Sequence, residues 1–166
     1  MRPHVPADSD PIDIRPIDAS SAGEILTLQR AAYVTEAQLN DDLQLPALTQ
    51  TLPDLVEELR RSRGLGGFAG NRLVGAVRIH RDGPDLRIGR LTVVPDLQGH
   101  GIGTALLRAA EAVDADAVEP PTASRLFTGE RSAANLRLYR RCGYVEDHRE
   151  SLTPDITLIH LVKLLR

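Results

Sequence analysis

The sequence is poor in several residue types, and each shortage excludes a class of protein. Cysteine occurs once, at Cys142, so no internal disulfide can form, as is typical of the reducing cytoplasm. No apolar run approaches the roughly 20 residues of a membrane-spanning helix, and the first residues lack the apolar stretch of a signal peptide. Aromatic residues make up only 3% of the chain, so aliphatic side chains must build the core. We therefore expect a cytoplasmic protein without a membrane span.

The net charge and the length of the chain further limit the kinds of protein that it can be. The formal net charge at pH 7 is −3, which argues against nucleic-acid binding because nucleic-acid-binding surfaces are strongly basic. The 166 residues, of which 42% are hydrophobic, are enough for one domain with its own core. We expect a loose polar leader over residues 1–10 and a single domain over residues 11–166. We expect no metal site.

Hydrophobic periodicity predicts an α/β domain with one mixed, mostly antiparallel sheet flanked by helices. A short strand over residues 12–14 should end at Pro16, and residues 36–52 should be irregular. The other expected strands cover residues 64–69, 72–80, 86–94, 125–128, 144–146 and 156–162. The expected helices cover residues 21–35, 53–60, 104–117 and 132–142.

The stretch 91–104 organises the rest of the chain. Its first four residues are apolar or β-branched and favour a buried strand, which Pro95 ends. Gly99, Gly101 and Gly103 then allow the backbone to approach a ligand without an intervening Cβ atom. The following residues favour a helix with an apolar stripe. Because free N–H groups and the helix dipole attract anions, this stretch predicts a phosphate or pyrophosphate site.

Two common nucleotide-binding loops do not fit this stretch. A Walker loop needs a lysine before serine or threonine, and none is present here. A dinucleotide fingerprint needs G-x-G-x-x-G early in a βαβ unit, whereas this chain has G-x-G-x-G after hairpin strands. The pattern Gln/Arg-x-x-Gly-x-Gly/Ala is met by residues 98–103.

A second motif lies in the expected helix over residues 132–142. Ser132 is suited to cap the start of this helix, and Gly143 is suited to end it. Asn135 and Tyr139 are four residues apart and therefore share one helix face. Alone, such a tyrosine is usually a packing residue. Cys142 is interpreted as a small packed hydrophobic residue.

Together, residues 91–104 and 135–144 resemble the signatures of the GCN5-related N-acetyltransferase (GNAT) family, and the resemblance covers residues 11–163. It implies the single-domain acyl-CoA N-acyltransferase fold, with a sheet that opens between the strand ending at Val94 and the strand ending at Thr128. Acetyl-CoA would lie in that gap. A primary amine of a small molecule or peptide would attack its thioester directly in a ternary complex.

The resemblance also implies roles for individual residues. Backbone groups of the strand would pair with the pantetheine arm, and the glycine loop would bind the pyrophosphate. The implied cofactor-binding residues are Thr92, Val93, Val94, Gln98, Gly99, His100, Gly101, Ile102, Gly103, Thr104 and Asn135. Tyr139 would protonate the departing thiolate as general acid. Many family members carry asparagine where this chain has Ser132, and Asn135 one turn later is the candidate replacement.

The general base is not apparent from the resemblance. The family often places a glutamate on the strand before the glycine loop, but residues 86–94 contain no carboxylate. The candidates are an ordered water chain, Glu130, Glu36 and His80. We favour water together with Glu130, which could also be only a helix-terminal carboxylate that favours the dipole.

The sequence leaves alternatives open for the acceptor and for the function itself. Acidic residues cluster between Glu36 and Glu58, which predicts either a solvated acidic face, the interpretation we favour, or an entrance for a cationic amine. A non-catalytic acyl-CoA-binding regulatory module is the main alternative to an enzyme. A nucleotide-binding protein that uses the same loop is a further one. A homodimer is compatible with the sequence, which does not fix the oligomeric state.

Overall fold

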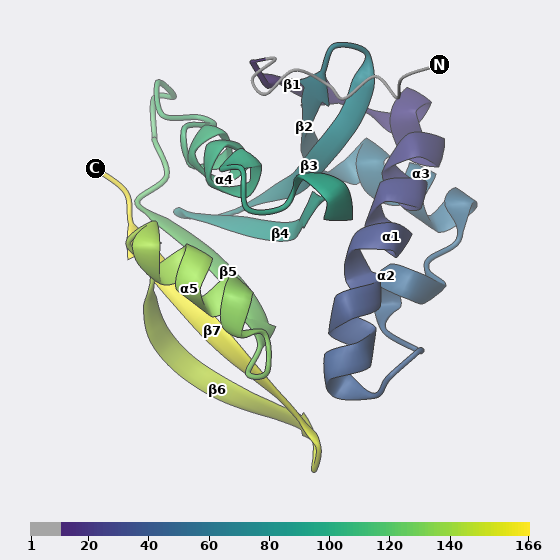
Figure 1. Ribbon diagram of the computed structural model, residues 1–166. Coiled ribbons are helices and arrows are strands. Elements are labelled where there is room, and N and C mark those ends of the chain that lie inside the picture. Colours follow the sequence, from purple (N-terminus) through teal and green to yellow (C-terminus); the bar gives the residue numbers. More distant parts are fainter. Residues whose placement is uncertain (1–10) are drawn as a thin grey trace.

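The computed structural model describes residues 11–166, so the leader expected over residues 1–10 lies outside the described residues (Figure 1). Seven strands form one sheet in the order β1-β2-β3-β4-β5-β7-β6. The strands are β1 (Asp13–Ile17), β2 (Arg63–Ala69), β3 (Arg72–Asp82), β4 (Asp85–Val93), β5 (Ala123–Gly129), β6 (Val145–Thr153) and β7 (Ile156–Leu164). The helices are α1 (Ala22–Asn40), α2 (Pro46–Thr49), α3 (Leu52–Arg61), α4 (Ile102–Glu111) and α5 (Ala133–Arg141), with 3-10 turns η1 (Ala19–Ser21) and η2 (Pro95–Leu97).

The sheet opens in its middle. Neighbouring strands pair antiparallel except β4 and β5, which are parallel. These two strands pair only over Asp85–Arg87 and Ala123–Arg125, near the start of each strand. Beyond Arg87 they diverge, as Figure 1 shows. This confirms the predicted α/β fold and leaves one edge of β4 without a strand partner among the described residues.

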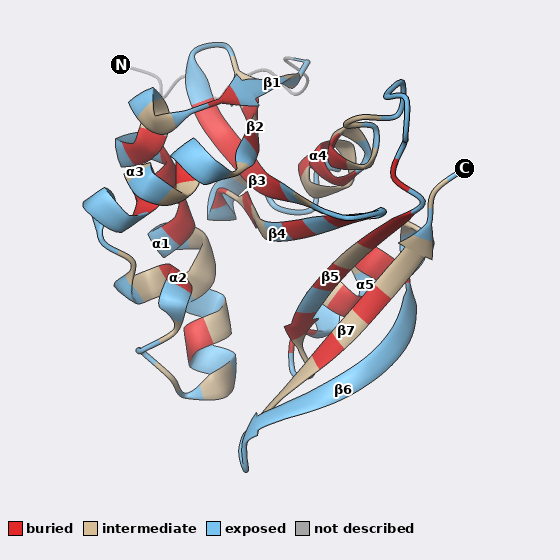
Figure 2. Ribbon diagram, turned by 180° about the vertical axis from the view of Figure 1, so that it is seen from behind, coloured by how far each residue is buried: buried red, intermediate tan, exposed pale blue. Residues whose placement is uncertain are grey.

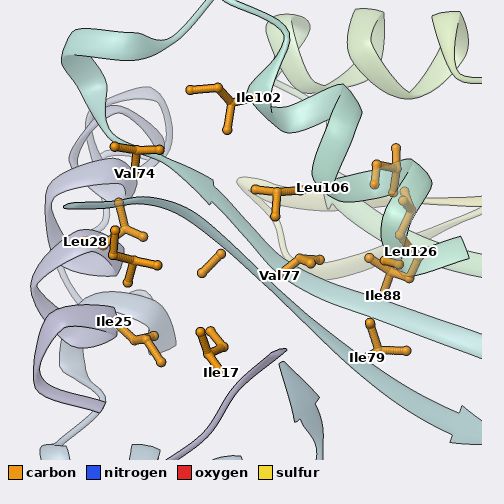
Figure 3. Close-up of a cluster of buried hydrophobic side chains, with 14 of the residues drawn as sticks. Ile17, Ile25, Leu28, Val74, Val77, Ile79, Ile88, Ile102, Leu106 and Leu126 are labelled. Atoms are coloured by element: carbon orange, nitrogen blue, oxygen red, sulfur yellow. The ribbon is translucent and has the colours of Figure 1, made fainter. Parts of the chain in front are cut away.

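The central strand β3 is covered on both faces. An ideal Cβ atom on Gly75 would lie 2.7 Å from Leu106 of α4, whereas Arg78 donates a hydrogen bond to Gln29 of α1. Side chains from α1, α4 and the strands between them form the core (Figure 3). Since helices pack on both faces, β3 is buried without interruption from Leu73 to Ile79.

The other half of the sheet is covered on one face. Helix α5 packs beside β5 and β7, and Tyr139 contributes to the core from this side. Strand β6 is exposed along its whole length, as Figure 2 shows. Within residues 11–166, no helix is both long and apolar enough to cross a membrane.

Several predicted boundaries were wrong. Strand β1 continues through Pro16, because β1 is an edge strand in which a missing N–H group can face away from the sheet. Helix α1 extends to Asn40 and ends where Asp41 adopts a left-handed conformation, so residues 36–40 are not irregular. Helix α4 ends at Glu111, well before residue 117. Strand β6 has nine residues instead of three, since pairing with β7 overrides its polar sequence.

Candidate active site

The glycine loop precedes α4 in the conformation that an anion site requires. Gly99 and Gly101 have φ angles of 82° and 81°, the left-handed region that favours glycine. A Cβ atom on either residue would meet no heavy atom within 4 Å, so the space above both is open. The first helical hydrogen bond runs from the Ala105 N–H to the Gly101 carbonyl, at 3.0 Å. The amides before Ala105 therefore have no partner within the helix and can bind an anion.

Two side chains hold the shape of this loop. The His100 Nδ1 atom lies 3.2 Å from the Leu97 carbonyl and 3.1 Å from the Gln98 carbonyl. The Gln98 side chain donates to the carbonyl of Val93, at 3.2 Å. Both side chains are thus engaged with the backbone, so the loop presents mainly its own N–H groups outward.

The strand before the loop has an open edge. Thr92 and Val93 pair with β3 through Ala76 and Gly75, and β5 has already diverged on the other side. The N–H of Val94 is different, because it donates to the Val74 carbonyl at 2.9 Å. Of the three residues predicted to pair with an extended ligand, Val94 therefore has no free N–H group.

Helix α5 borders the first turn of α4. A Cβ atom on Gly103 would lie 3.4 Å from Leu138 and 3.8 Å from Val93, which is ordinary packing contact, so α4 and α5 pack directly against each other at this point. Tyr139 follows Leu138 and is 6% exposed. The structure thus brings the two predicted motifs together, with the helix that carries Tyr139 against the first turn of α4.

The Tyr139 side chain is buried, but its hydroxyl has no hydrogen-bond partner among the described residues. No hydrogen bond links it to another residue of the described range 11–166, and burial raises the pKa of Tyr139 above its ordinary value. Tyr144 shows the contrast: its hydroxyl donates to Glu111 at 2.8 Å and accepts from Ser124 at 2.6 Å. A protonated phenol with no partner in the protein is free to donate to a bound group, whereas Tyr144 is part of a structural network.

Ser132 and Asn135 are directed toward a carboxylate of α1. Ser132 begins α5, but its hydroxyl donates to Glu36 and not to the helix backbone, so the prediction of a side-chain cap was wrong. Asn135 donates to Glu36 and to Thr128, at 3.3 Å each. Glu36 is half-buried, and its charge is among the causes that raise the pKa of Tyr139. The structure therefore places a fixed carboxylate near Tyr139.

The other two base candidates have different surroundings. Glu130 is an exposed residue that directly follows β5, and its carboxylate lies 3.7 Å from Arg149 of β6. His80 is exposed near the end of β3 and lines the cleft described next.

Cys142 is a free, half-buried thiol that packs against the core, in agreement with its interpretation as a packed residue.

A cleft of about 670 Å³ lies where β4 and β5 part, on the side of α1 and α3. Residues 87–90 of β4, Phe127 of β5 and Tyr33 of α1 line it. Because it borders the open edge of β4, it is a candidate site for the second substrate. Burial raises the pKa of Tyr33, so its phenol stays protonated at neutral pH.

Part of the acidic stretch reaches this cleft. Asp54, Glu57 and Glu58 of α3 are among its lining residues. Glu57 is paired with Arg61 at 2.7 Å, and Glu58 lies 3.2 Å from Arg78. The acidic character of the cleft is therefore largely compensated by arginines.

Comparison of the sequence with known protein families shows which family the chain belongs to. The sequence profile described as an acetyltransferase (GNAT) domain matches residues 57–146, which are more than half of the chain. The chain belongs to the GNAT acetyltransferase family. The match covers both the glycine loop and the helix that carries Tyr139 in this GNAT protein.

Solved structures share the fold of this GNAT chain. A PaiA N-acetyltransferase of Thermoplasma acidophilum, solved in complex with coenzyme A, has 18% identity and a TM-score of 0.72, covering 90% of this chain and 98% of that one. YncA of Salmonella typhimurium, a putative acetyltransferase solved with acetyl-CoA, has 14% identity and a TM-score of 0.71, covering 95% of each chain. The UPF0157 protein YqkA of Bacillus subtilis is 30% identical over 129 residues, which are 76% of this chain. The chain spans only 35% of the length of YqkA.

Sequence reasoning missed three residues of the cleft. Arg78 is the only charged residue in the buried run from Leu73 to Ile79, a signal that could have been noticed. Arg90 has a φ angle of 52° at a register shift between β3 and β4, which nothing in the local sequence indicates. Tyr33 lies near the middle of the long helix α1, where its sequence neighbours gave no reason to single it out.

Proposed function

We propose that this GNAT protein transfers the acetyl group of acetyl-CoA to a primary amine of a small molecule or peptide. The observation that carries the proposal is the meeting of three features at one place. An anion-binding helix start follows the open edge of β4, and the first turn of α4 lies against Leu138 of α5, the helix that carries the partner-free hydroxyl of Tyr139.

Acetyl-CoA fits the part of the site formed by β4 and α4. The open space above Gly99 and Gly101 and the unpaired amides of Ile102, Gly103 and Thr104 suit a pyrophosphate. The open edge at Thr92 and Val93 suits an extended pantetheine arm that pairs like an added strand. Gln98 and His100 contribute by fixing the loop. That two structures of the same fold hold coenzyme A or acetyl-CoA supports this assignment.

The transfer needs two proton movements. The amine nitrogen attacks the thioester carbonyl carbon, the carbon–sulfur bond breaks, and the sulfur leaves as a thiolate. Tyr139 donates its phenolic proton to that thiolate, a role supported by the raised pKa, which keeps the phenol protonated, and by the absence of a competing partner. The proton of the attacking amine passes to a base.

The surroundings of the carboxylates support Glu36 over Glu130 as that base. Glu36 is held by Ser132 and Asn135 near Tyr139, whereas Glu130 faces Arg149 and solvent. Asn135 would then orient the base instead of contacting the cofactor. Glu36 accepts one hydrogen bond at each of its two oxygens, so each oxygen keeps a lone pair that can take the proton from the amine or from an intervening water.

The test is a free-thiol assay with acetyl-CoA and a panel of amines. An acetyltransferase releases coenzyme A rapidly only when an acceptor is present, and mass spectrometry then finds the acetylated amine. A non-catalytic module binds acetyl-CoA but shows no amine-dependent release. A nucleotide-binding protein instead loses bound acetyl-CoA when ATP competes for the loop. Either of the last two results contradicts the proposal.

A further inference from the structure

Two arginines converge on the acceptor side of the cleft with few partners of opposite charge. This inference rests on the proposed function and concerns which acceptors the same site takes. Arg78 and Arg90 both line the cleft, and the charge of each acts on the other. A guanidinium group is always ionised in proteins, so the two arginines repel each other, and an anion bound near both would relieve that repulsion.

Arg78 is a buried cation with free donors. It is only 6% exposed, and its Nη2 atom donates to Gln29 at 2.7 Å. Its Nε atom lies 3.2 Å from Glu58, yet neither Nε nor Nη1 has a hydrogen bond of acceptable geometry. Buried guanidinium donors are normally satisfied, so Arg78 is a cation that its protein surroundings satisfy only in part.

Arg90 lies against the phenol of Tyr33 but has no partner of opposite charge among the described residues. Its Nε atom is buried without a hydrogen bond, and no carboxylate within the described residues lies within 4.0 Å of its guanidinium group. The guanidinium carbon lies 6.0 Å from the ring centre of Tyr33. Its left-handed backbone, at a bulge where β4 leaves β5, directs a side chain that the regular pleat would place elsewhere.

Most of the other charged side chains that line the cleft already have partners within the protein. Glu57 is paired with Arg61, and the Asp54 carboxylate accepts from Thr51 at 2.7 Å. Arg87, which also lines the cleft, is paired with Asp82 at 2.6 Å. Of the arginines that line the cleft, Arg90 is thus the one without a carboxylate partner among the described residues.

We propose that the acceptor carries a carboxylate besides its amine, and that the guanidinium group of Arg90 binds this carboxylate, while the buried charge of Arg78 adds to the attraction. A planar carboxylate matches the donor geometry of a guanidinium group. The amine of such an acceptor points toward the thioester, while its carboxylate stays at Arg90. The acceptors are therefore amino acids and related amino carboxylic acids, not polyamines.

The experiment compares acceptors that differ only in this group. Amino acids are assayed beside their primary amides, which keep the amine and lose the negative charge. We expect the wild-type kcat/KM to be about 10- to 100-fold higher for the acids, as a charge-assisted pair provides. Arg90→Gln should remove this preference and leave the KM for acetyl-CoA unchanged, whereas Arg90→Lys should keep part of it. Arg87→Gln is the matched control, because it removes an exposed paired arginine of the same cleft and should keep the preference.

A binding measurement separates this inference from the proposed function. Calorimetry with coenzyme A and an N-acetylated amino acid should show binding that the N-acetylated amide lacks, whether or not turnover occurs. Equal use or binding of acids and amides by the wild type overturns the inference, even if acetyl transfer itself is confirmed. A preference for acids that survives in Arg90→Gln, folded with an unchanged melting temperature, also overturns it. Absence of coenzyme A release with every amine refutes the proposed function alone.

Discussion

Replacing each of two neighbouring tyrosines by phenylalanine separates chemistry from stability. The rings of Tyr139 and Tyr144 are 6.0 Å apart, and both are buried. Each substitution removes one hydroxyl oxygen and nothing else. The two hydroxyls differ in their partners, since that of Tyr139 has none in the described part of the chain and that of Tyr144 has two.

The structure predicts opposite outcomes for the two variants. Tyr144→Phe breaks the hydrogen bonds to Ser124 and to the Glu111 carboxylate, which costs about 1.5–3 kcal/mol of unfolding free energy. For a domain of this size that lowers the Tm by roughly 3–12 °C. Tyr139→Phe breaks no hydrogen bond and should change the unfolding free energy by less than about 1 kcal/mol. It should lower kcat by about 100- to 10,000-fold, as loss of a general acid does.

Thermal unfolding and steady-state acetylation of the same preparations provide the assay. The KM for acetyl-CoA should change little in Tyr139→Phe, because its hydroxyl acts on the leaving thiolate and not on the bound thioester. Wild-type turnover by Tyr139→Phe would remove this residue from the mechanism. A large loss of Tm in that variant would show that its hydroxyl has a structural partner, against the geometry found here.

Three further predictions concern packing, pH and the base. Gly75→Ala places a methyl group 2.7 Å from a leucine of α4 and should lower stability in urea unfolding by about 1–3 kcal/mol, whereas Gly89→Ala, with no atom within 4 Å, should not. Because burial raises the pKa of Tyr139, its acid form persists to higher pH, so the pH profile of kcat should show no alkaline fall below about pH 10. Glu36→Gln should lower kcat/KM by roughly 100-fold, whereas Glu130→Gln should stay within about twofold of wild type. The reverse order of these two variants would restore Glu130 as the base.

The parts of the site that local sequence controls were predictable. Gly99 and Gly101 adopt left-handed backbone that few other residues tolerate, so their spacing alone indicated the loop. The opening between β4 and β5 followed from the family resemblance and is confirmed by their short pairing. That Asn135 and Tyr139 lie on the same face of one helix could also be predicted, because it depends only on the period of the helix.

The parts that depend on distant partners could not be predicted. Ser132 has the sequence position of a helix cap, but it bonds to Glu36, which lies 96 residues earlier in the chain. The conformation of Arg90 results from a register shift against β3, and strand propensity carries no information about such a shift. The acidic stretch predicted a surface charge without revealing that Arg61 and Arg78 compensate it. In each case the decisive contact joins segments far apart in sequence.

The most direct test of the account is a calorimetric titration of acetyl-CoA into wild type, Gly101→Glu and Gly70→Glu. Both glycines have left-handed backbone and open space above them, with φ angles of 81° and 59°, so the two substitutions impose similar strain. Only Gly101 lies at the start of α4, where a glutamate would occupy the pyrophosphate position with a like charge. We expect wild type and Gly70→Glu to bind acetyl-CoA and Gly101→Glu not to bind it. Tight binding by Gly101→Glu would contradict it.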